Sequence, residues 1–177
     1  DAPDDLIPQF EFIRKSVKAF NLPSIELINY EADDLIATYV EQILREGAKA
    51  TIVSSDKDLM QLYKKNIRIY DPMKNKFISN EDINNKFGVN PDKVVDVQAL
   101  AGDSSDNVPG VPGIGIKTAA ELINKYGDLE NLLKNTNKIK QNKRRETLIQ
   151  NKDKAIISKK LVTLKKDVPI KNKISEF

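Results

Sequence analysis

The chain has 177 residues, enough for one compact domain or two small ones, and its 40% hydrophobic and 31% charged residues are typical of a globular protein. It contains no cysteine and no histidine, which excludes disulfides, thiolate metal sites and serine–histidine catalysis and leaves carboxylates as side-chain metal ligands. No apolar run approaches the roughly 18 residues of a membrane span, so we expect no membrane partner.

Charge is unevenly distributed along the chain, although the net value is only +3. Residues 1–136 hold 16 Lys or Arg against 22 Asp or Glu, whereas residues 137–177 hold 13 against 4. An acidic body with a basic end suits a carboxylate metal site beside a phosphate-binding surface. An AT-rich genome would also enrich Lys and Asn on any surface, so the charge pattern alone leaves both interpretations open.

Hydrophobic periodicity predicts alternating helices and strands in the first half of the chain. Helices are expected over 5–20, 32–45 and 58–63, and strands over 25–28, 50–53, 66–70 and 76–78. The first helix should be amphipathic, because Phe10, Ile13 and Val17 recur at three- and four-residue steps. This order of elements implies an α/β layer with at least part of a parallel sheet.

After about Gly88 the pattern becomes helical. Helices are expected over 92–100, 117–126, 128–134, 143–150 and 153–164, with a hairpin that ends at Gly115 and an Asn/Lys-rich loop at 134–143. We therefore predict a division into an α/β part, residues 1–88, and an all-helical part, residues 89–177.

Seven acidic residues stand out because they occur in three tight groups. The groups are Glu31, Asp33 and Asp34; Asp56 and Asp58; and Asp103 and Asp106. The first lies at the expected start of a helix, the second directly follows the strand 50–53, and the third lies in a turn rich in Gly, Ser and Asn. Ligands of open α/β sheets bind at the carboxyl ends of the strands, where the second group lies.

Each group also has a purely structural explanation. Acids at a helix N-terminus are favoured by the helix dipole, by roughly 0.3–1 kcal/mol, and Asp in turns bonds to its own backbone. If the three groups converge, however, their repulsion requires hard cations, and Mg²⁺ or Mn²⁺ with oxygen ligands fits. Two such ions about 3.5–4 Å apart activate water and stabilise the leaving oxygen in phosphodiester cleavage.

Residues 107–120, N-V-P-G-V-P-G-I-G-I-K-T-A-A, predict a glycine-rich hairpin ahead of a helix. Glycines let a backbone approach a ligand closely, N–H groups at a helix N-terminus bind phosphate, and Lys117 adds a positive charge. Such a site would hold the DNA backbone without reading bases. The alternative is a tight turn between helices that binds nothing. The spacing of Gly110, Gly113 and Gly115 matches neither a dinucleotide fingerprint nor a P-loop.

Three long motifs resemble successive signature blocks of the flap-endonuclease-like 5′-nucleases, and in particular the 5′→3′ exonuclease domain of bacterial DNA polymerase I. They are Tyr30-Glu-Ala-Asp-Asp-Leu-Ile-Ala37, Ser54-Ser-Asp-Lys-Asp-Leu59 and Gly102-Asp-Ser-Ser-Asp-Asn-Val-Pro-Gly-Val-Pro-Gly-Ile-Gly-Ile-Lys-Thr-Ala119. Their order and spacing agree with the family over essentially the whole chain. The resemblance implies a PIN-like α/β core followed by a helical helix–three-turn–helix subdomain that grips duplex DNA.

The resemblance also implies roles for individual residues. Glu31, Asp33 and Asp34 would serve a first divalent ion, and Asp56, Asp58, Asp103 and Asp106 a second, partly through water. Gly113, Ile114, Gly115, Lys117 and Thr118 would lie at the DNA backbone, and carbonyls of Val111, Ile114 and Ile116 would hold a monovalent cation, K⁺. The reaction would be metal-dependent hydrolysis at a 5′ end or flap during DNA replication and repair. The resemblance further implies a bacterial, cytoplasmic, nucleoid-associated protein with a polymerase portion in the same parent chain.

The departure from the family is at the front of the chain. Family members begin with two Asp-bearing strands and a basic helical gateway that threads the 5′ strand, and the sequence contains no counterpart of these. We therefore expect an N-terminally truncated core with an incomplete sheet, and little cleavage by this chain alone. Two competing hypotheses are a non-catalytic duplex-DNA-binding module that uses the hairpin, and a PIN-type RNA nuclease.

Overall fold

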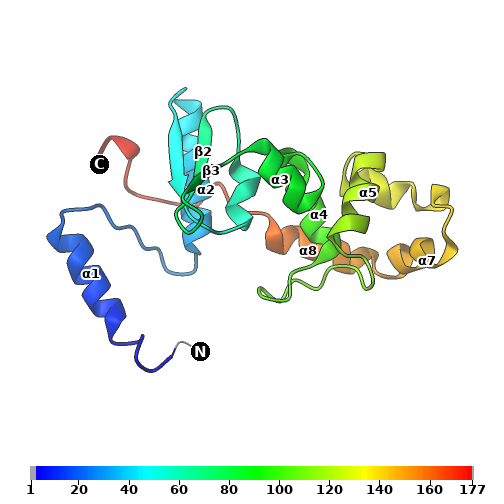
Figure 1. Cartoon of the computed structure of the whole chain (residues 1–177), viewed down its shortest axis with the longest axis horizontal. Helices are drawn as coiled ribbons and strands as arrows, with labels where there is room; N and C mark the ends of the chain where they lie inside the picture. Colours follow the sequence, from blue (N-terminus) through cyan, green and yellow to red (C-terminus); the bar gives the residue numbers. More distant parts are fainter. Residues whose placement is uncertain (1–2, 177) are drawn as a thin grey trace.

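The computed structural model describes residues 3–176. In Figure 1 a small sheet with α2 forms one part of an elongated molecule, α3 to α8 form another, and α1 lies apart at the end of an extended segment. The first half contains α1 Gln9–Ala19, α2 Ala32–Arg45, β1 Ala50–Val53, the 3-10 helix η1 Asp58–Leu62, β2 Ile67–Asp71, β3 Lys76–Ile78 and α3 Asn80–Phe87. Within the described residues, no helix is both long and apolar enough to cross a membrane.

The sheet has the order β1-β2-β3. β1 and β2 are parallel, with Ala50 opposite Ile67, and β2 and β3 are antiparallel, with Ile69 opposite Ile78. Side chains alternate between the faces of each strand, and Ile52, Ile67 and Ile69 point into the core. The predicted strands at 50–53, 66–70 and 76–78 and the partly parallel pairing are therefore confirmed.

Two predictions for the front of the chain need correction. The expected strand at 25–28 is extended chain that ends in a turn, because a strand requires a hydrogen-bonded neighbour and, among the described residues, β1 pairs only with β2. The first helix is shorter than expected and starts after Pro8. Its apolar residues, including Phe10 and Ile13, are exposed, because no other element of residues 3–176 covers α1.

The helix α3 was not predicted. Its sequence is polar, but a capping box stabilises its first turn: the Asp82 backbone N–H donates to Ser79 Oγ, and the Ser79 backbone N–H donates to the Asp82 carboxylate. Gly88 ends the helix in the left-handed conformation (φ 71°). A Ser at 79 followed by an Asp three residues later was the signal available in the sequence.

The second half is helical, as predicted. It contains η2 Pro91–Lys93, α4 Val94–Ala101, α5 Ile116–Tyr126, α6 Leu129–Lys134, η3 Thr136–Lys138, α7 Asn142–Gln150, α8 Lys152–Val162 and η4 Ile174–Glu176. α4 is the central element and packs against α5 and α8. The segment after α8 returns to α2, where the Val168 backbone N–H donates to Thr38 Oγ1.

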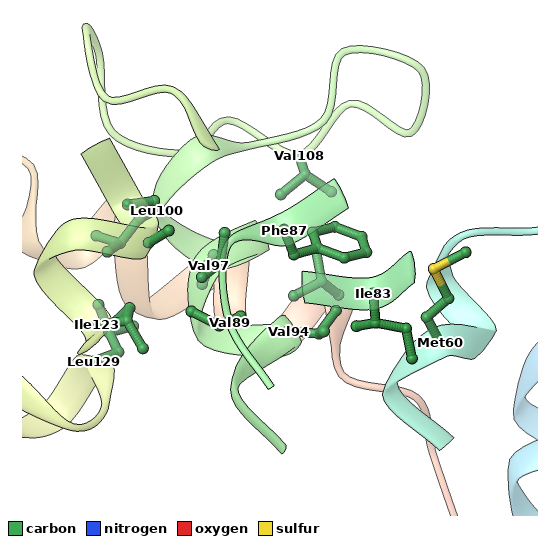
Figure 2. Close-up of a cluster of buried hydrophobic side chains, with 14 of the residues drawn as sticks. Met60, Ile83, Phe87, Val89, Val94, Val97, Leu100, Val108, Ile123 and Leu129 are labelled. Atoms are coloured by element: carbon green, nitrogen blue, oxygen red, sulfur yellow. The ribbon is translucent and has the colours of Figure 1, made fainter. Parts of the chain in front are cut away.

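A single hydrophobic core joins the two halves. Figure 2 shows Met60 of η1 and Phe87 of α3 in one cluster with Val97 of α4, Ile123 of α5 and Leu129 of α6. The core is continuous across residue 88, so α4 and α5 pack against the sheet-bearing half. The division of the chain into an α/β part, residues 1–88, and a helical part, residues 89–177, stays a prediction.

Candidate functional site

Six of the seven acids named above line one pocket of about 250 Å³. Its acidic lining residues are Glu31, Asp33, Asp56, Asp58, Asp103 and Asp106. The remaining wall comes from Gln98 on α4, from Asn107 and Val108, and from Leu161, Val162 and Leu164 at the end of α8. Acids that lie more than 70 residues apart in the sequence therefore meet at one place.

Three structural features bring these acids together. Glu31 is the N-cap of α2 and Asp33 lies in its first turn, where the positive end of the helix dipole favours a carboxylate. Asp56 and Asp58 follow β1, in the turn that leads into η1. Asp103 and Asp106 lie in the loop after α4, and that loop is closed by paired backbone hydrogen bonds between Asp103 and Val108 at 2.8 and 2.9 Å.

The pKa shifts follow from burial and from the mutual repulsion of these groups. Burial, together with the negative charges of Asp56, Asp58, Glu31 and Asp34, raises the pKa of Asp33 to about 6. Burial likewise raises the pKa of Asp58, with contributions from Asp56 and Asp106, against the lowering effect of a hydrogen bond from Gln98. The pocket thus concentrates negative charge that its own residues neutralise only in part.

The partial neutralisation comes from Lys57. Its ammonium forms an ion pair with Asp103, whose pKa that hydrogen bond lowers, while the contact with Asp103 raises the pKa of Lys57. Within residues 3–176, no three carboxylates lie close enough to form a ligand group for one ion. This spacing still suits Mg²⁺, which keeps several waters and binds through one or two carboxylates rather than in an all-protein cage.

The seventh acid, Asp34, lies elsewhere. Its Oδ1 accepts a hydrogen bond of 2.8 Å from the backbone N–H of Lys165, so it anchors the segment that returns from α8 to α2. Successive residues of a helix turn by about 100°, which separates Asp34 from Asp33. Asp34 is not among the residues that line the pocket, although its charge contributes to the raised pKa of Asp33. Its predicted role as a metal ligand stays a prediction.

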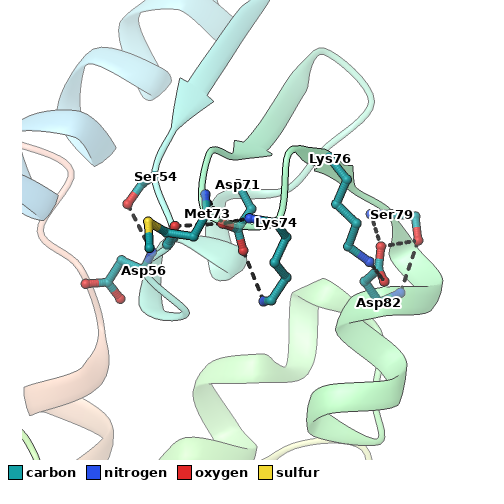
Figure 3. Close-up of polar contacts among 9 residues, drawn as sticks. Ser54, Asp56, Asp71, Met73, Lys74, Lys76, Ser79 and Asp82 are labelled. Atoms are coloured by element: carbon teal, nitrogen blue, oxygen red, sulfur yellow. Dashed lines mark hydrogen bonds and ion pairs between the residues drawn. The ribbon is translucent and has the colours of Figure 1, made fainter.

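Two further acids near the sheet, Asp71 and Asp82, are neutralised by hydrogen bonds and ion pairs (Figure 3). Asp71 accepts hydrogen bonds from Ser55 Oγ at 2.7 Å and from the backbone N–H groups of Met73 and Lys74, and it pairs with Lys74 Nζ at 3.0 Å. The bonds from Ser55 and Lys74 lower the pKa of Asp71 to about 2. Asp82 pairs with Lys76 at 2.6 Å, and that bond lowers its pKa to about 2 as well.

The glycine-rich hairpin has an internally braced base. Gly102 (φ 74°) and Gly110 (φ 59°) lie against each other, because a Cβ on Gly110 would approach the Gly102 nitrogen to 2.5 Å. The Gly110 backbone N–H also donates to the buried hydroxyl of Ser158 on α8. These contacts require glycine for packing and fix the hairpin relative to the acidic pocket.

The tip of the hairpin, unlike its base, does not need glycine for packing. Gly113 and Gly115 are exposed, and a Cβ at either position would meet nothing within 4 Å. Gly115 is the N-cap of α5 at φ −89°, so neither packing nor backbone conformation requires a glycine there. Open space beside both glycines is what a closely approaching ligand backbone needs.

The N-terminus of α5 is uncapped and positive. Gly115 offers no side-chain hydrogen bond, and the first turn contains no acid but contains exposed Lys117. The helix dipole disfavours a cation at this position, whereas a bound anion would be favoured by the dipole, the free N–H groups and Lys117 together. By contrast, Asp128 caps α6 by accepting from the Asn131 backbone N–H. The α5 N-terminus is therefore suited to a phosphate.

Sequence reasoning missed several residues of these surfaces. Gln98 and Ser158 lie outside the quoted motifs, and Lys57 lies inside one of them without a predicted role; the tertiary fold brings all three to the acids or the hairpin. Lys143 and Arg144 of α7 share a hollow of about 540 Å³ with Gly113 and the buried Ile114. The basic composition of residues 137–177 was the one signal for this last pair.

A larger hollow of about 970 Å³ lies between α2 and α8. Several of its charged residues are held in ion pairs: Lys159 contacts Asp96 at 2.7 Å and Glu130 at 2.8 Å, and Glu41 contacts Lys64 and Lys166. The acidic pocket is smaller but gathers six carboxylates, which makes it the candidate site for metal-dependent chemistry.

Two family models match the chain. One, described as 5′-3′ exonuclease, N-terminal resolvase-like domain, matches residues 1–88, and the other, described as 5′-3′ exonuclease, C-terminal SAM fold, matches residues 89–177. DNA polymerase I of Rhizobium leguminosarum is 56% identical over 168 residues, which are 95% of this chain and 16% of that protein. The 5′-3′ exonuclease of Aquifex aeolicus is 43% identical over 169 residues, 96% of this chain and 57% of that protein. The chain thus spans less than two thirds of these relatives.

Solved structures share the fold. T5 5′-exonuclease with bound zinc has a TM-score of 0.82 at 21% identity over 93% of this chain and 63% of that one. The catalytic core of Rad2 in complex with DNA substrate has a TM-score of 0.55 at 18% identity over 94% of this chain and 59% of that one. The α/β core with a helical subdomain, predicted above, is confirmed by these structures and by the two family models.

Proposed function

Because the chain belongs to the 5′-3′ exonuclease family, we propose that it is the metal-binding and DNA-gripping part of a structure-selective 5′-nuclease. The proposed reaction is hydrolysis of DNA or RNA-primer phosphodiesters at 5′ ends and flaps. The observation that carries the proposal is the convergence of six carboxylates from three separate segments on one pocket.

The donor chemistry of the pocket fits divalent magnesium or manganese. Its side-chain oxygens are hard ligands, and the raised pKa of Asp33 marks negative charge that a cation would neutralise. When bound, a pair of such ions lowers the pKa of the attacking water and stabilises the leaving oxygen. We assign Glu31 and Asp33 to the first ion and Asp56, Asp58, Asp103 and Asp106 to the second, partly through water.

We propose that the hairpin tip and α5 hold the DNA backbone. Gly113, Gly115 and the α5 N-terminus offer open backbone to a phosphate, and Lys117 and Thr118 flank it. Ile114 can contribute only its backbone, because its side chain is buried. The carbonyl groups of Val111, Ile114 and Ile116 are the proposed ligands of a monovalent cation, K⁺.

The partners follow from this assignment. The proposed substrate is duplex or branched DNA with a 5′ end or flap, and a polymerase portion in the same parent chain is proposed from relatives named DNA polymerase I. Segment 1–88 would then supply Glu31, Asp33, Asp56 and Asp58, and segment 89–177 would supply Asp103, Asp106 and the hairpin that grips DNA. A cytoplasmic location is proposed, in keeping with bacterial DNA-processing relatives.

The test is cleavage of a labelled 5′-flap DNA by the full-length product of the gene, with Mg²⁺ or Mn²⁺ and with a chelator. We expect metal-dependent release of short 5′ products. Asp58→Asn and Asp103→Asn should each lower the rate by roughly 100-fold or more, since each removes a charged oxygen ligand. Asp92→Asn, which changes an exposed acid outside the pocket, is the matched control and should leave the rate unchanged.

Duplex binding separates the proposal from a non-catalytic DNA-binding module. If the protein does not cleave the flap DNA, and duplex binding is unchanged by Asp56→Ala together with Asp103→Ala while Lys117→Glu abolishes it, the hairpin alone is the working part. Preference for RNA single strands over branched DNA would instead favour an RNA nuclease.

A further inference from the structure

One amide side chain in the acidic pocket has a hydrogen-bond partner at only one of its two ends. Gln98 of α4 is 4% exposed and lines the pocket, and its Nε2 donates a hydrogen bond to Asp58 Oδ1. Its Oε1 is buried and accepts no hydrogen bond from the described residues. Buried amides are normally satisfied at both ends, so this acceptor requires an explanation.

The orientation of the amide is set by Asp58. A carboxylate only accepts hydrogen bonds, so the Nε2 end of Gln98 must face Asp58, and the Oε1 end must face away from it. Exchanging the two ends would put two acceptors in contact. The unpartnered Oε1 is therefore a consequence of the contact with Asp58, and the fold keeps it despite the free-energy cost.

The neighbours of Gln98 show that the position could have been apolar. Val97, Ala99 and Leu100 beside it on α4 are fully buried, and an aliphatic side chain at 98 would leave no unmatched acceptor. The fold therefore keeps a polar side chain beside Asp58 at a position that packing alone would fill with an aliphatic one.

We propose that Gln98 is a positioning residue for the cation of the acidic pocket. Its Nε2 holds the Asp58 carboxylate in one orientation, and the unpartnered Oε1 is the cost of that contact. This inference rests on the metal site of the proposed function. It adds a neutral side chain that acts through Asp58 rather than as a direct ligand, which is how outer-shell groups orient metal ligands.

Gln61 of η1 provides a matched control. It is a half-buried glutamine whose two amide ends are both satisfied: Nε2 donates to the Val162 carbonyl at 2.9 Å, and Oε1 accepts from the Leu164 backbone N–H at 3.2 Å. It lies outside the acidic pocket. Methionine has nearly the same shape as glutamine without the amide, so Gln98→Met and Gln61→Met delete the same groups in two settings.

The experiment measures Mn²⁺ affinity by isothermal titration calorimetry and Tm in a chelator, both with the full-length protein. Gln98→Met should weaken Mn²⁺ binding by roughly 10- to 100-fold while leaving the metal-free Tm unchanged or higher. Gln61→Met should lower Tm and leave Mn²⁺ affinity unchanged. A purely structural role for Gln98 predicts the opposite, a lower metal-free Tm with wild-type affinity, and that result would overturn the proposal.

Asp58→Asn separates this inference from the proposed function. If wild type binds Mn²⁺ and Asp58→Asn abolishes binding, but Gln98→Met binds as wild type does, only the role of Gln98 is refuted. If Asp58→Asn leaves Mn²⁺ binding unchanged, the metal does not bind in this pocket, and both proposals are overturned.

Discussion

Two groups of acids near the carboxyl ends of the same small sheet differ in how they are neutralised. Asp71 and Asp82 each have a lysine partner and several hydrogen-bond donors, and those contacts hold the pKa of both at about 2. Asp33 and Asp58 lie among other carboxylates, and burial and repulsion raise the pKa of both. Figure 3 shows Asp56, which lines the acidic pocket with Asp33 and Asp58, pointing away from Asp71 and Asp82.

This difference means that the role of an acidic residue in a turn cannot be assigned until its neighbours in space are known. A satisfied carboxylate stabilises the fold it belongs to, whereas a repelling one costs stability that a bound cation or protonation recovers. Function is therefore expected where the fold tolerates unneutralised charge, and stability where it does not. The two groups should respond in opposite ways to the same kind of substitution.

The largest effect is expected from Asp71→Ala. The change leaves Ser55 Oγ, two backbone N–H groups and the Lys74 ammonium without their acceptor. We expect the Tm of the metal-free protein to fall by roughly 5–10 °C, measured by calorimetry, because these donors lose a shared, buried acceptor. An unchanged Tm would mean that the contacts of Asp71 do not stabilise the fold, which would contradict the comparison.

A smaller effect of opposite sign is expected from Asp33→Asn. Removing one charge relieves repulsion from Asp56 and Asp58, so the metal-free Tm should rise by roughly 2–4 °C. The same variant should bind Mn²⁺ more weakly, as titration calorimetry would detect. A fall in both Tm and Mn²⁺ affinity would mean that Asp33 stabilises the metal-free fold, contrary to the expected repulsion.

The smallest effect is the pH dependence of stability in a chelator. Asp33 ionises at about 6 in the folded protein and near 4 when unfolded, so its contribution is fully present below about pH 4 and lost as pH rises through 6. Asp71 and Asp82 act in reverse: their contribution is present above about pH 4 and lost as pH falls toward 2.

We therefore expect the metal-free Tm to be higher near pH 4.5 than at pH 7, by roughly 1–3 °C. Adding Mn²⁺ at pH 7 should recover the difference, and Asp33→Asn should flatten it. Thermal scans at the two pH values check both, and a Tm that rises steadily to pH 7 without metal would contradict the comparison.

Much of the fold was predictable because its signals are local. The helix over Ala32–Arg45 and the strands over Ala50–Val53 and Lys76–Ile78 follow from apolar spacing within a few residues. The helix α3 escaped because its sequence is polar and its cap is a single serine–aspartate pair. The expected strand at 25–28 is not formed because strands depend on neighbours that periodicity does not reveal.

The sequence by itself determined which residues are acidic, where the hairpin lies and which family the motifs resemble, because these depend on residue type and short spacing. The tertiary structure was needed to show that Asp34 bonds to Lys165 while Asp33 lies near Asp56 and Asp58. It also showed that Gln98 and Lys57 contact the acids of the pocket. The physical reason is that charge and hydrogen-bond satisfaction depend on distance in space, and a chain folded around one core sets those distances between residues far apart in sequence.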